Sequence, residues 1–330
     1  MIPFIIIIII IINLSSPYFS NSAEDLSKLV IVGDELQDKG ALKKSIAMKA
    51  TRENATFFTQ CRYLVLREVR NLRRDVKGLV ARFGTVIFLN LLFGFIFLNA
   101  GKQNRADPVL IQNAFGALTM VTISSMFGSA SPALLTFPAE RPIFLREYAT
   151  GTYSLGSYLV SKMVIESPLL FLQTIVMSLC NYFLIGFEGN YMLMVLCWWG
   201  LALATNSIAL LVGSAITDVQ QAAEFLPAIF VPQLLFAGFF IATQNIPVWL
   251  RWAEWITTLK YTLNLLLLIE FTGHSCNDSP QASTNCESIL TRNNISSSDI
   301  GLYIGIIAAI FVGLRIVGAL LLKQRASTVF

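Results

Sequence analysis

The chain has 330 residues, of which 55% are hydrophobic and only 13% are charged, and its formal net charge is +4. Soluble domains carry about 25% charged residues, so this composition, with a mean hydropathy of +0.65, excludes an ordinary soluble protein and indicates an all-α, multi-pass membrane protein. The 5 cysteines are too few for a disulfide scaffold, and the single histidine, His274, offers few routes to a metal or catalytic site, so we expect no metal.

The first 56 residues are expected to be a low-complexity start and a linker. The isoleucine run within residues 1–20 has no basic residue before it and is short for a membrane span. We interpret it as a gene-model or truncation artefact, with an uncleaved anchor and a signal peptide as alternatives. The motif LVIVGDE at residues 29–35 is similar to the strand that holds Mg²⁺ in phosphate-loop ATPases. Because the sequence contains no phosphate loop of the Gly-x4-Gly-Lys-Ser/Thr type, we read this segment as linker with short helices.

Residues 57–83 show the periodicity of an amphipathic helix. Many lysines and arginines lie among its apolar positions, opposed only by Glu68 and Asp75. This charge favours a helix that lies on an anionic membrane leaflet. Binding to nucleic acid is the rival interpretation, but the helix runs directly into an apolar span, so we predict no nucleic-acid partner.

Six membrane spans are predicted after this helix, because each segment is apolar and long enough to cross a bilayer. They cover residues 83–98, 110–131, 158–185, 191–216, 225–242 and 300–322. The fifth contains Pro227 and Pro232, so we expect it to be kinked or broken. Residues 247–271 are rich in tryptophan in the first half and apolar but short in the second, which indicates an interfacial or re-entrant helix pair.

Residues 137–162, FPAERPIFLREYATGTYSLGSYLVSK, form a charged island between the second and third spans. Charged side chains cost too much at the bilayer centre, so we expect this island in water or at the headgroups. We predict a short helix with Phe144 on its apolar side and four residues on its wet side: Glu140, Arg141, Arg146 and Glu147. Such a helix is suited to transmit a movement of a soluble partner to the membrane helices. The alternative is a plain solvated loop.

The positive-inside rule orients the spans, because most of the 24 lysines and arginines fall on one side. That side holds the N-terminal region, the charged island, the loop at residues 217–224 and the tail at residues 323–330. We therefore predict that both termini are cytosolic. Arg315, in the last span, lies nearer this side, and its side chain is expected to reach the surface there.

The loop at residues 272–299 is predicted to be outside. Cys276 and Cys286 lie close together in its polar sequence, a spacing that allows a disulfide in an oxidising compartment. Asn277 and Asn294 begin glycosylation sequons. Each signal is weak alone, but together with the charge bias they place this loop on the outer side.

A few polar and aromatic residues inside the spans are candidates for function. Glu166 is an ionisable group in the third span, and the alternative is an acid that reaches headgroup water or pairs locally. We expect Asn206 and Thr122 to hydrogen-bond between helices. The candidates for a substrate path are Phe236, Phe239, Phe240, Asn206 and Thr122, and the alternative for the aromatic rings is packing or contact with lipid.

The order of these parts resembles the membrane domain of G-subfamily ABC transporters, the white and pleiotropic drug resistance type. The resemblance runs over residues 57–322. Its most specific part is ERPIFLREYATGTYS at residues 140–154, followed by the basic helix TQCRYLVLREVRNLRRD and by FAGFF with IPVWLRWAEWITTLKY. The loop that carries the two cysteines is also similar.

The resemblance implies a role for each part. Residues 57–82 would be the connecting helix and residues 83–322 the six-helix transmembrane domain. The segment at residues 140–147 would be the coupling helix that contacts an ATPase domain. Phe239 and Phe240 would narrow the path above the substrate cavity. Cys276 and Cys286 would form the outer-loop disulfide.

In this family two membrane domains pair around a central cavity, and ATP hydrolysis drives the export of lipids, sterols or hydrophobic drugs. The family places an ATPase domain before the membrane part, whereas this sequence lacks both the phosphate loop and the Leu-Ser-Gly-Gly-type signature. We therefore expect no enzyme activity and no cofactor in the chain itself, with ATP and Mg held by a partner ATPase domain.

The sequence thus predicts the transmembrane subunit of an exporter of hydrophobic substrates, surrounded by membrane lipid and situated in the plasma membrane. It would work as a homodimer or heterodimer with another membrane domain. The alternative is a non-transporting, truncated or regulatory partner that dimerises with full-length relatives.

Overall fold

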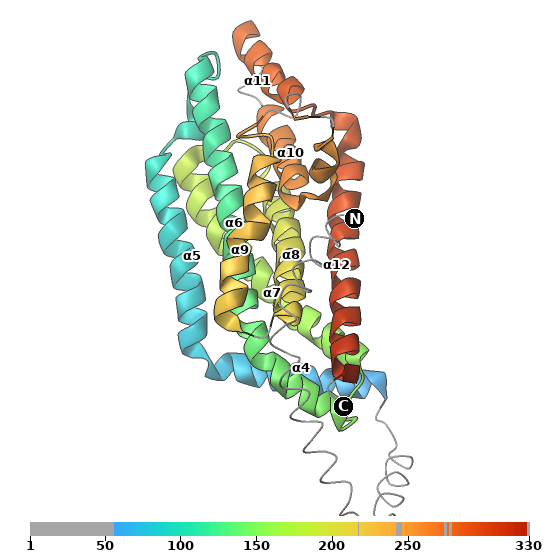
Figure 1. Cartoon of the computed structure of the whole chain (residues 1–330). Helices are drawn as coiled ribbons and strands as arrows, with labels where there is room; N and C mark the ends of the chain where they lie inside the picture. Colours follow the sequence, from blue (N-terminus) through green and yellow to red (C-terminus); the bar gives the residue numbers. More distant parts are fainter. Residues whose placement is uncertain are drawn as a thin grey trace, which may run out of the picture.

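A computed structural model describes residues 56–216, 218–241, 246–247, 249–273, 276 and 279–328. The isoleucine run, the LVIVGDE motif, His274 and Asn277 lie outside the described residues. Within these residues every regular element is a helix, and the long helices stand side by side in one bundle (Figure 1). The all-α membrane fold is therefore confirmed.

The described chain begins with α4 (Phe57–Arg74), which lies across one end of the bundle, and α5 (Val76–Ile96), which runs along it (Figure 1). The sequence predicted a single amphipathic helix to residue 83, and the structure corrects this boundary. Asp75 separates the two helices because its side chain accepts a hydrogen bond from the backbone N–H of Gly78 and caps α5.

The helix α6 (Pro108–Ala149) has 42 residues and continues through Pro132, Pro138 and Pro142. Much of the charged island is therefore helical, and only a short turn separates α6 from α7 (Leu155–Asn181). Residues 140–147 are helical, as predicted, but they form the end of α6 and not a separate short helix or a loop. A polar composition requires contact with water. A helix that extends out of the membrane meets this requirement as well as a loop does.

The helix α8 (Tyr191–Ala215) is the centre of the bundle, where it contacts α6, α7, α10 and α12. Trp198 and Leu201 on α8 are completely buried. Hydrophobic residues from all of these helices form one continuous buried cluster around it.

The fifth predicted span differs from the structure. α9 (Val219–Leu235) ends well before residue 242, and Gly238 then turns the chain with a φ of 91°, a left-handed conformation that glycine adopts without strain. At 1.5 Å per residue α9 is about 26 Å long, less than the bilayer core of about 30 Å. Among the described residues, the helices long and apolar enough to cross a membrane are Val76–Lys102, Pro108–Pro138, Leu155–Gly186, Tyr191–Ala215 and Ser297–Gln324.

The short helix pair predicted after α9 is present as η4 (Arg251–Ile256) and α10 (Thr258–Phe271). The side chains of Trp249, just before η4, and of Trp255, within it, are exposed, which agrees with the predicted interfacial composition. In contrast, α10 is almost completely buried between α8 and α12. Its 14 residues span about 21 Å, too short to cross the bilayer.

The far end of the bundle from α4 carries α11 (Pro280–Arg292), which the sequence did not predict, and the chain then enters α12 (Ile300–Thr328) (Figure 1). Ser279 caps α11 by accepting a hydrogen bond from the backbone N–H of Ala282. A disulfide joins Cys276 to Cys286 and so ties the end of the preceding loop to α11.

Gly101, in η1 (Ala100–Lys102), lies where two connecting segments touch. A Cβ atom there would lie 2.5 Å from the carbonyl oxygen of Gly186. We expect Gly101→Ala to lower the free energy of unfolding by about 1–3 kcal/mol, because the backbone must move to admit the methyl group. Thermal unfolding of the purified protein measures this loss. Gly301→Ala is the control, since nothing lies within 4 Å of its added methyl group, and an equal loss in both variants would contradict the prediction.

Candidate coupling site and membrane-embedded polar network

An aromatic cluster joins the end of α6 to the start of α7 at the α4 end of the bundle. The buried ring of Phe144 lies 5.7 Å from the ring of Tyr148 and 4.4 Å from the ring of Tyr158, measured between centroids. Leu64 of α4 is buried in the same cluster. Phe144 therefore lies on the apolar side of this segment, and its part in coupling stays a prediction.

An ion pair connects α4 to the end of α6. Nη1 of Arg67 lies 2.8 and 2.7 Å from the two carboxylate oxygens of Glu147, and the hydroxyl of Tyr153 donates to the same carboxylate at 2.8 Å. Partial burial raises the pKa of Glu147, but the hydrogen bonds from Arg67 and Tyr153 outweigh it, so the pKa lies below its usual value. Burial and the bond to Glu147 raise the pKa of Tyr153, which stays a donor.

A second ionic contact joins three helices. Nζ of Lys162 on α7 lies 3.3 Å from a carboxylate oxygen of Glu68 on α4, and it also donates a hydrogen bond to Glu140 on α6. In addition, the side-chain oxygen of Gln60 on α4 accepts hydrogen bonds from the backbone of Ser154 and the hydroxyl of Ser157, at 3.0 and 2.7 Å. These polar contacts hold α4 against the α6–α7 turn.

The five residues predicted to couple the chain to a partner occupy three kinds of environment. Glu140 and Glu147 pair with cations of the chain itself. Arg141 is buried, so its expected place on the wet side was wrong, because it lies on the same face as the packed Phe144. Arg146 is exposed, and so is Ile143 three residues earlier. Residues three apart share a helix face, so these two side chains form one surface patch.

Arg315 stands at the centre of a polar network inside the membrane. Its guanidinium lies 3.2 Å from the carboxylate of Glu166 on α7, and it donates to Asn206 and Ser207 on α8 at 2.9 and 3.0 Å. The expected reach of Arg315 to the surface was wrong, because three polar partners inside the bundle hold it. Glu166 pairs locally, which was the alternative to a functional role.

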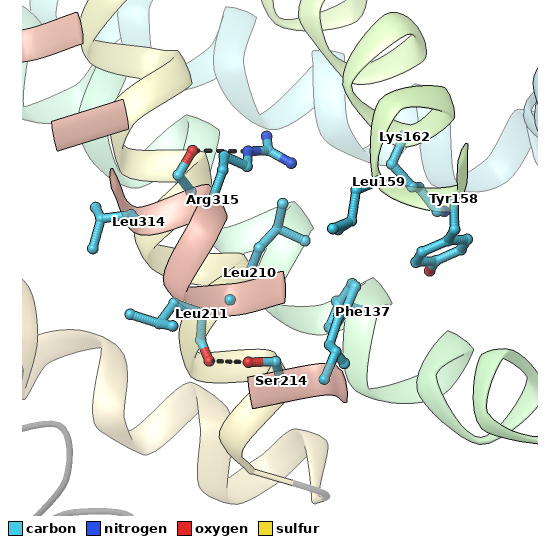
Figure 2. Close-up of a pocket in the computed structure, with 12 residues that line it drawn as sticks. Phe137, Tyr158, Leu159, Lys162, Leu210, Leu211, Ser214, Leu314 and Arg315 are labelled. Carbon is cyan, nitrogen blue, oxygen red and sulfur yellow. Dashed lines mark hydrogen bonds between the residues drawn. The ribbon is translucent and has the colours of Figure 1, made fainter. Parts of the chain in front are cut away.

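Figure 2 shows the small pocket beside this network, with Arg315 and Lys162 on opposite sides of it. Its volume is about 20 Å³, enough for one water molecule. Nη1 of Arg315 is buried there without a hydrogen-bond partner among the described residues.

The residues predicted for a substrate path lie in three places, one of which is the Arg315 network that holds Asn206. Thr122 is buried between α6 and α8, where its hydroxyl accepts a hydrogen bond from the indole of Trp198 at 3.2 Å. The ring of Phe239, on the segment after α9, packs against Phe115 of α6 and Phe240, with centroid distances of 5.2 and 5.0 Å. Phe240 is exposed and Phe236 is half-buried. Their role in a path stays a prediction.

A buried ion pair that sequence reasoning missed stabilises the opposite, α11 end. Nη2 of Arg105 lies 2.7 Å from the carboxylate of Glu270 and 3.7 Å from that of Glu188. The Glu270 carboxylate also accepts the backbone N–H of Gly189 at 2.9 Å, and the guanidinium lies over the ring of Phe271. The available signal was the acid at the end of the apolar run LNLLLLIEF, which needs a partner if buried.

Comparison with known proteins adds three kinds of relative. A family model described as "ABC-2 type transporter" matches residues 59–271. The "Broad substrate specificity ATP-binding cassette transporter ABCG2" of Sus scrofa is 28% identical over 74% of this chain and 37% of its own length. "Protein white" of Drosophila melanogaster is 28% identical over 82% of this chain and 40% of its own.

"Pleiotropic drug resistance protein 1" of Petunia hybrida is 29% identical over 67% of this chain and 15% of its own length. The chain therefore spans less than half the length of each of these relatives. The range that the family model matches runs from the first turn of α4 to the end of α10.

Proposed function

Because this chain belongs to the ABC-2 type transporter family, we propose that it is the transmembrane part of an ATP-driven exporter of hydrophobic substrates. An ATPase domain outside the described residues would drive it, and ATP and Mg would bind there. The observation that carries the proposal is the junction of α4, α6 and α7, where the Arg67–Glu147 pair and the Lys162 contacts join a surface patch to the membrane helices. A displacement of that patch would be transmitted directly to α7.

The surface patch of Ile143 and Arg146 would be the docking point for the ATPase domain. An exposed apolar side chain beside an exposed cation offers both apolar burial and a charge-assisted contact. In this proposal the α4 end of the bundle faces the cytosol, together with both termini, and the membrane is the plasma membrane. Asn294, exposed in the turn after α11, would then carry a glycan outside.

The proposed working unit is a dimer with a second membrane domain, either another copy of this chain or a relative. The substrate would pass near Phe239, whose ring packs against Phe115 of α6, and near the adjacent Phe240. The proposed substrates are lipid, sterol or drug-like, and the relatives' names, which refer to broad substrate specificity and to drug resistance, support the drug-like class.

Reconstitution tests the proposal. The purified chain is placed in vesicles with a fluorescent hydrophobic substrate, with and without an added ATPase domain from a relative, and ATP-dependent flux is measured. We expect flux only with the ATPase domain and ATP. Absence of flux in both arms, with the ATPase domain shown to bind, would leave a non-transporting partner of longer relatives as the better account.

The docking patch leads to a separate expected result. We expect Arg146→Glu to lower ATP-driven flux about tenfold, the effect of losing one charge-assisted contact of about 1.5 kcal/mol, with no loss of protein from the membrane. Arg73→Glu is the matched control, since Arg73 is an exposed arginine on α4 outside the patch. Equal flux in the two variants would place the docking point elsewhere.

A further inference from the structure

The helix α5 meets the rest of the bundle along a narrow line. Its buried residues are Val86, Asn90 and Gly94, which follow one another at intervals of four positions and therefore share one face of the helix. Large side chains elsewhere on α5, such as Phe88 and Phe95, are exposed. Because lipid is as apolar as these side chains, the bilayer supplies little hydrophobic force between helices. Apolar packing alone therefore holds α5 weakly in any one position along its neighbours.

An amide pair joins this face to α7. Asn90 lies close to the midpoint of the membrane-crossing segment Val76–Lys102, and its amide oxygen accepts a hydrogen bond of 2.8 Å from the amide nitrogen of Asn181. The two residues are 1% and 0% exposed, so water does not reach them. An amide without its partner is costly at this depth. The two helices are therefore most stable in the position where these amides meet.

Two further polar contacts agree with this position but restrain it less. Nε of Arg82 donates to the side-chain oxygen of Gln173 at 2.7 Å, and this pair is separated by 91 positions, as the asparagine pair is. The long side chain of Arg82 can follow a shift of α5, since its guanidinium is mobile on its stem. Beyond α5, the backbone N–H of Asn99 donates to the carbonyl of Leu184 at 2.9 Å. Asn99 is exposed, so water can replace that bond.

The shape of the contact restrains the position of α5 only partly. Leu184 lies in η2 (Tyr182–Gly186), a π-helix that continues α7, and its side chain fills the space beside Gly94. A Cβ atom at Gly94 would lie 2.8 Å from Cδ1 of Leu184. Because that atom is the end of a flexible, half-buried side chain, it can move aside by changing rotamer. The amide pair is thus the contact that a shift of one turn breaks without a substitute.

The pair is better suited to select a position than to add stability. The amide oxygen of Asn181 is buried without a hydrogen-bond partner among the described residues, so the two amides form one interhelical bond where two are possible. Buried asparagines in coiled coils likewise specify the register of the helices at a cost in stability.

We propose that the Asn90–Asn181 pair fixes the register of α5 on α7, so that α5 can tilt on its neighbour but cannot slide along it. Because Asp75 joins α5 to α4, the same pair sets the place where α4 meets α7. This inference does not depend on the proposed transport function.

Disulfide mapping of the full chain in vesicles tests the register, with Gly94→Cys and Leu184→Cys in one reporter variant. The Cβ positions of these residues are 3.0 Å apart, close to the 3.5–4.5 Å of a disulfide. If α5 slides by one turn, the new cysteine of α5 meets Cys180 instead, which is free and lies one turn before Leu184 on the same face. Mass spectrometry of the oxidised protein gives the ratio of the two cross-links.

The reporter variant alone should form almost only the cross-link between the two new cysteines. Addition of Asn90→Leu with Asn181→Leu should raise the ratio in favour of Cys180 about tenfold, which corresponds to 1.4 kcal/mol, while the midpoint of thermal unfolding does not fall. Asn90→Ser with Asn181→Ser should change the ratio in the same direction, because each hydroxyl can bond to a carbonyl of its own helix and is too short to reach the other. The test therefore does not depend on the folding of one variant.

The matched control is Ser129→Ala with Thr205→Val in the same reporter variant. These two hydroxyls form an equally buried polar contact of 2.7 Å, but between α6 and α8, so their removal should leave the cross-link ratio unchanged. A ratio that stays the same in both asparagine variants would show that packing sets the register and would overturn the proposal. A change in the control as large as that in the asparagine variants would overturn it as well.

Discussion

Glu270→Ala is expected to destabilise the fold by about 3–5 kcal/mol, the cost of leaving a buried charge without its closest partner. The side chains of Glu270 and Arg105 are each only 1% exposed, so neither charge can turn toward water. Removal of the carboxylate also leaves the backbone N–H groups of Glu188 and Gly189 without their acceptor. Most of the variant should fail to fold. The measurements are the fraction that stays monodisperse in detergent and the midpoint of thermal unfolding.

The matched control is Glu287→Ala, which removes an exposed acid from α11 near the same end and should change the midpoint little. The double variant Glu270→Leu with Arg105→Met should recover part of the stability, because an apolar pair of similar volume avoids the desolvation of two charges. A single variant as stable as the natural chain would show that the pair contributes little.

Glu147→Arg is expected to remove most ATP-driven flux, whereas the exchange variant Arg67→Glu with Glu147→Arg should restore it. The single change places two cations together at the contact between α4 and α6, and the exchange rebuilds the pair in reverse. The two side chains are 38% and 31% exposed, so solvent screens the pair and the stability cost should be about 1 kcal/mol or less. Flux in vesicles, normalised to folded protein, measures the effect.

This expectation depends on the proposed transport function. An exchange variant as inactive as the single variant would show that Glu147 acts on an outside partner and not on α4. The pair should also be insensitive to pH near neutrality. Because the pKa of Glu147 is lowered in the folded chain, its contribution to stability is complete above the ordinary carboxyl range and is lost only as the pH falls through the lowered value.

The parts of the fold that follow from local composition could be predicted. The apolar spans other than the fifth, the short pair around η4 and α10, and the amphipathic character of α4 each depend on residues near one another in the chain. The signal for the helix boundary at Asp75 was also local. Aspartate is a common N-cap residue, and here its side chain accepts a hydrogen bond from the backbone N–H of Gly78, three residues later. Periodic charges continue on both sides of Asp75, so the two helices were predicted as one.

The polar contacts could not be predicted, because their partners are distant in sequence. Arg105 and Glu270 are 165 positions apart, and Arg315 and Glu166 are 149 apart. Each acid or base alone indicates only that a partner is needed if it is buried. For the same reason, Arg141 and Glu147 could not be distinguished in the sequence, although Arg141 is buried and Glu147 pairs with Arg67.

The guanidinium of Arg315 also limits how the membrane helices can move relative to one another. Sliding α12 by one helical turn would carry the charge about 5.4 Å away from Glu166, Asn206 and Ser207 and leave it in hydrocarbon. The three helices that supply these groups, α7, α8 and α12, must therefore shift together as one rigid block. Any rearrangement during a working cycle has to occur at the edges of that block, where α5, α6, α9 and α10 meet it, and not within it.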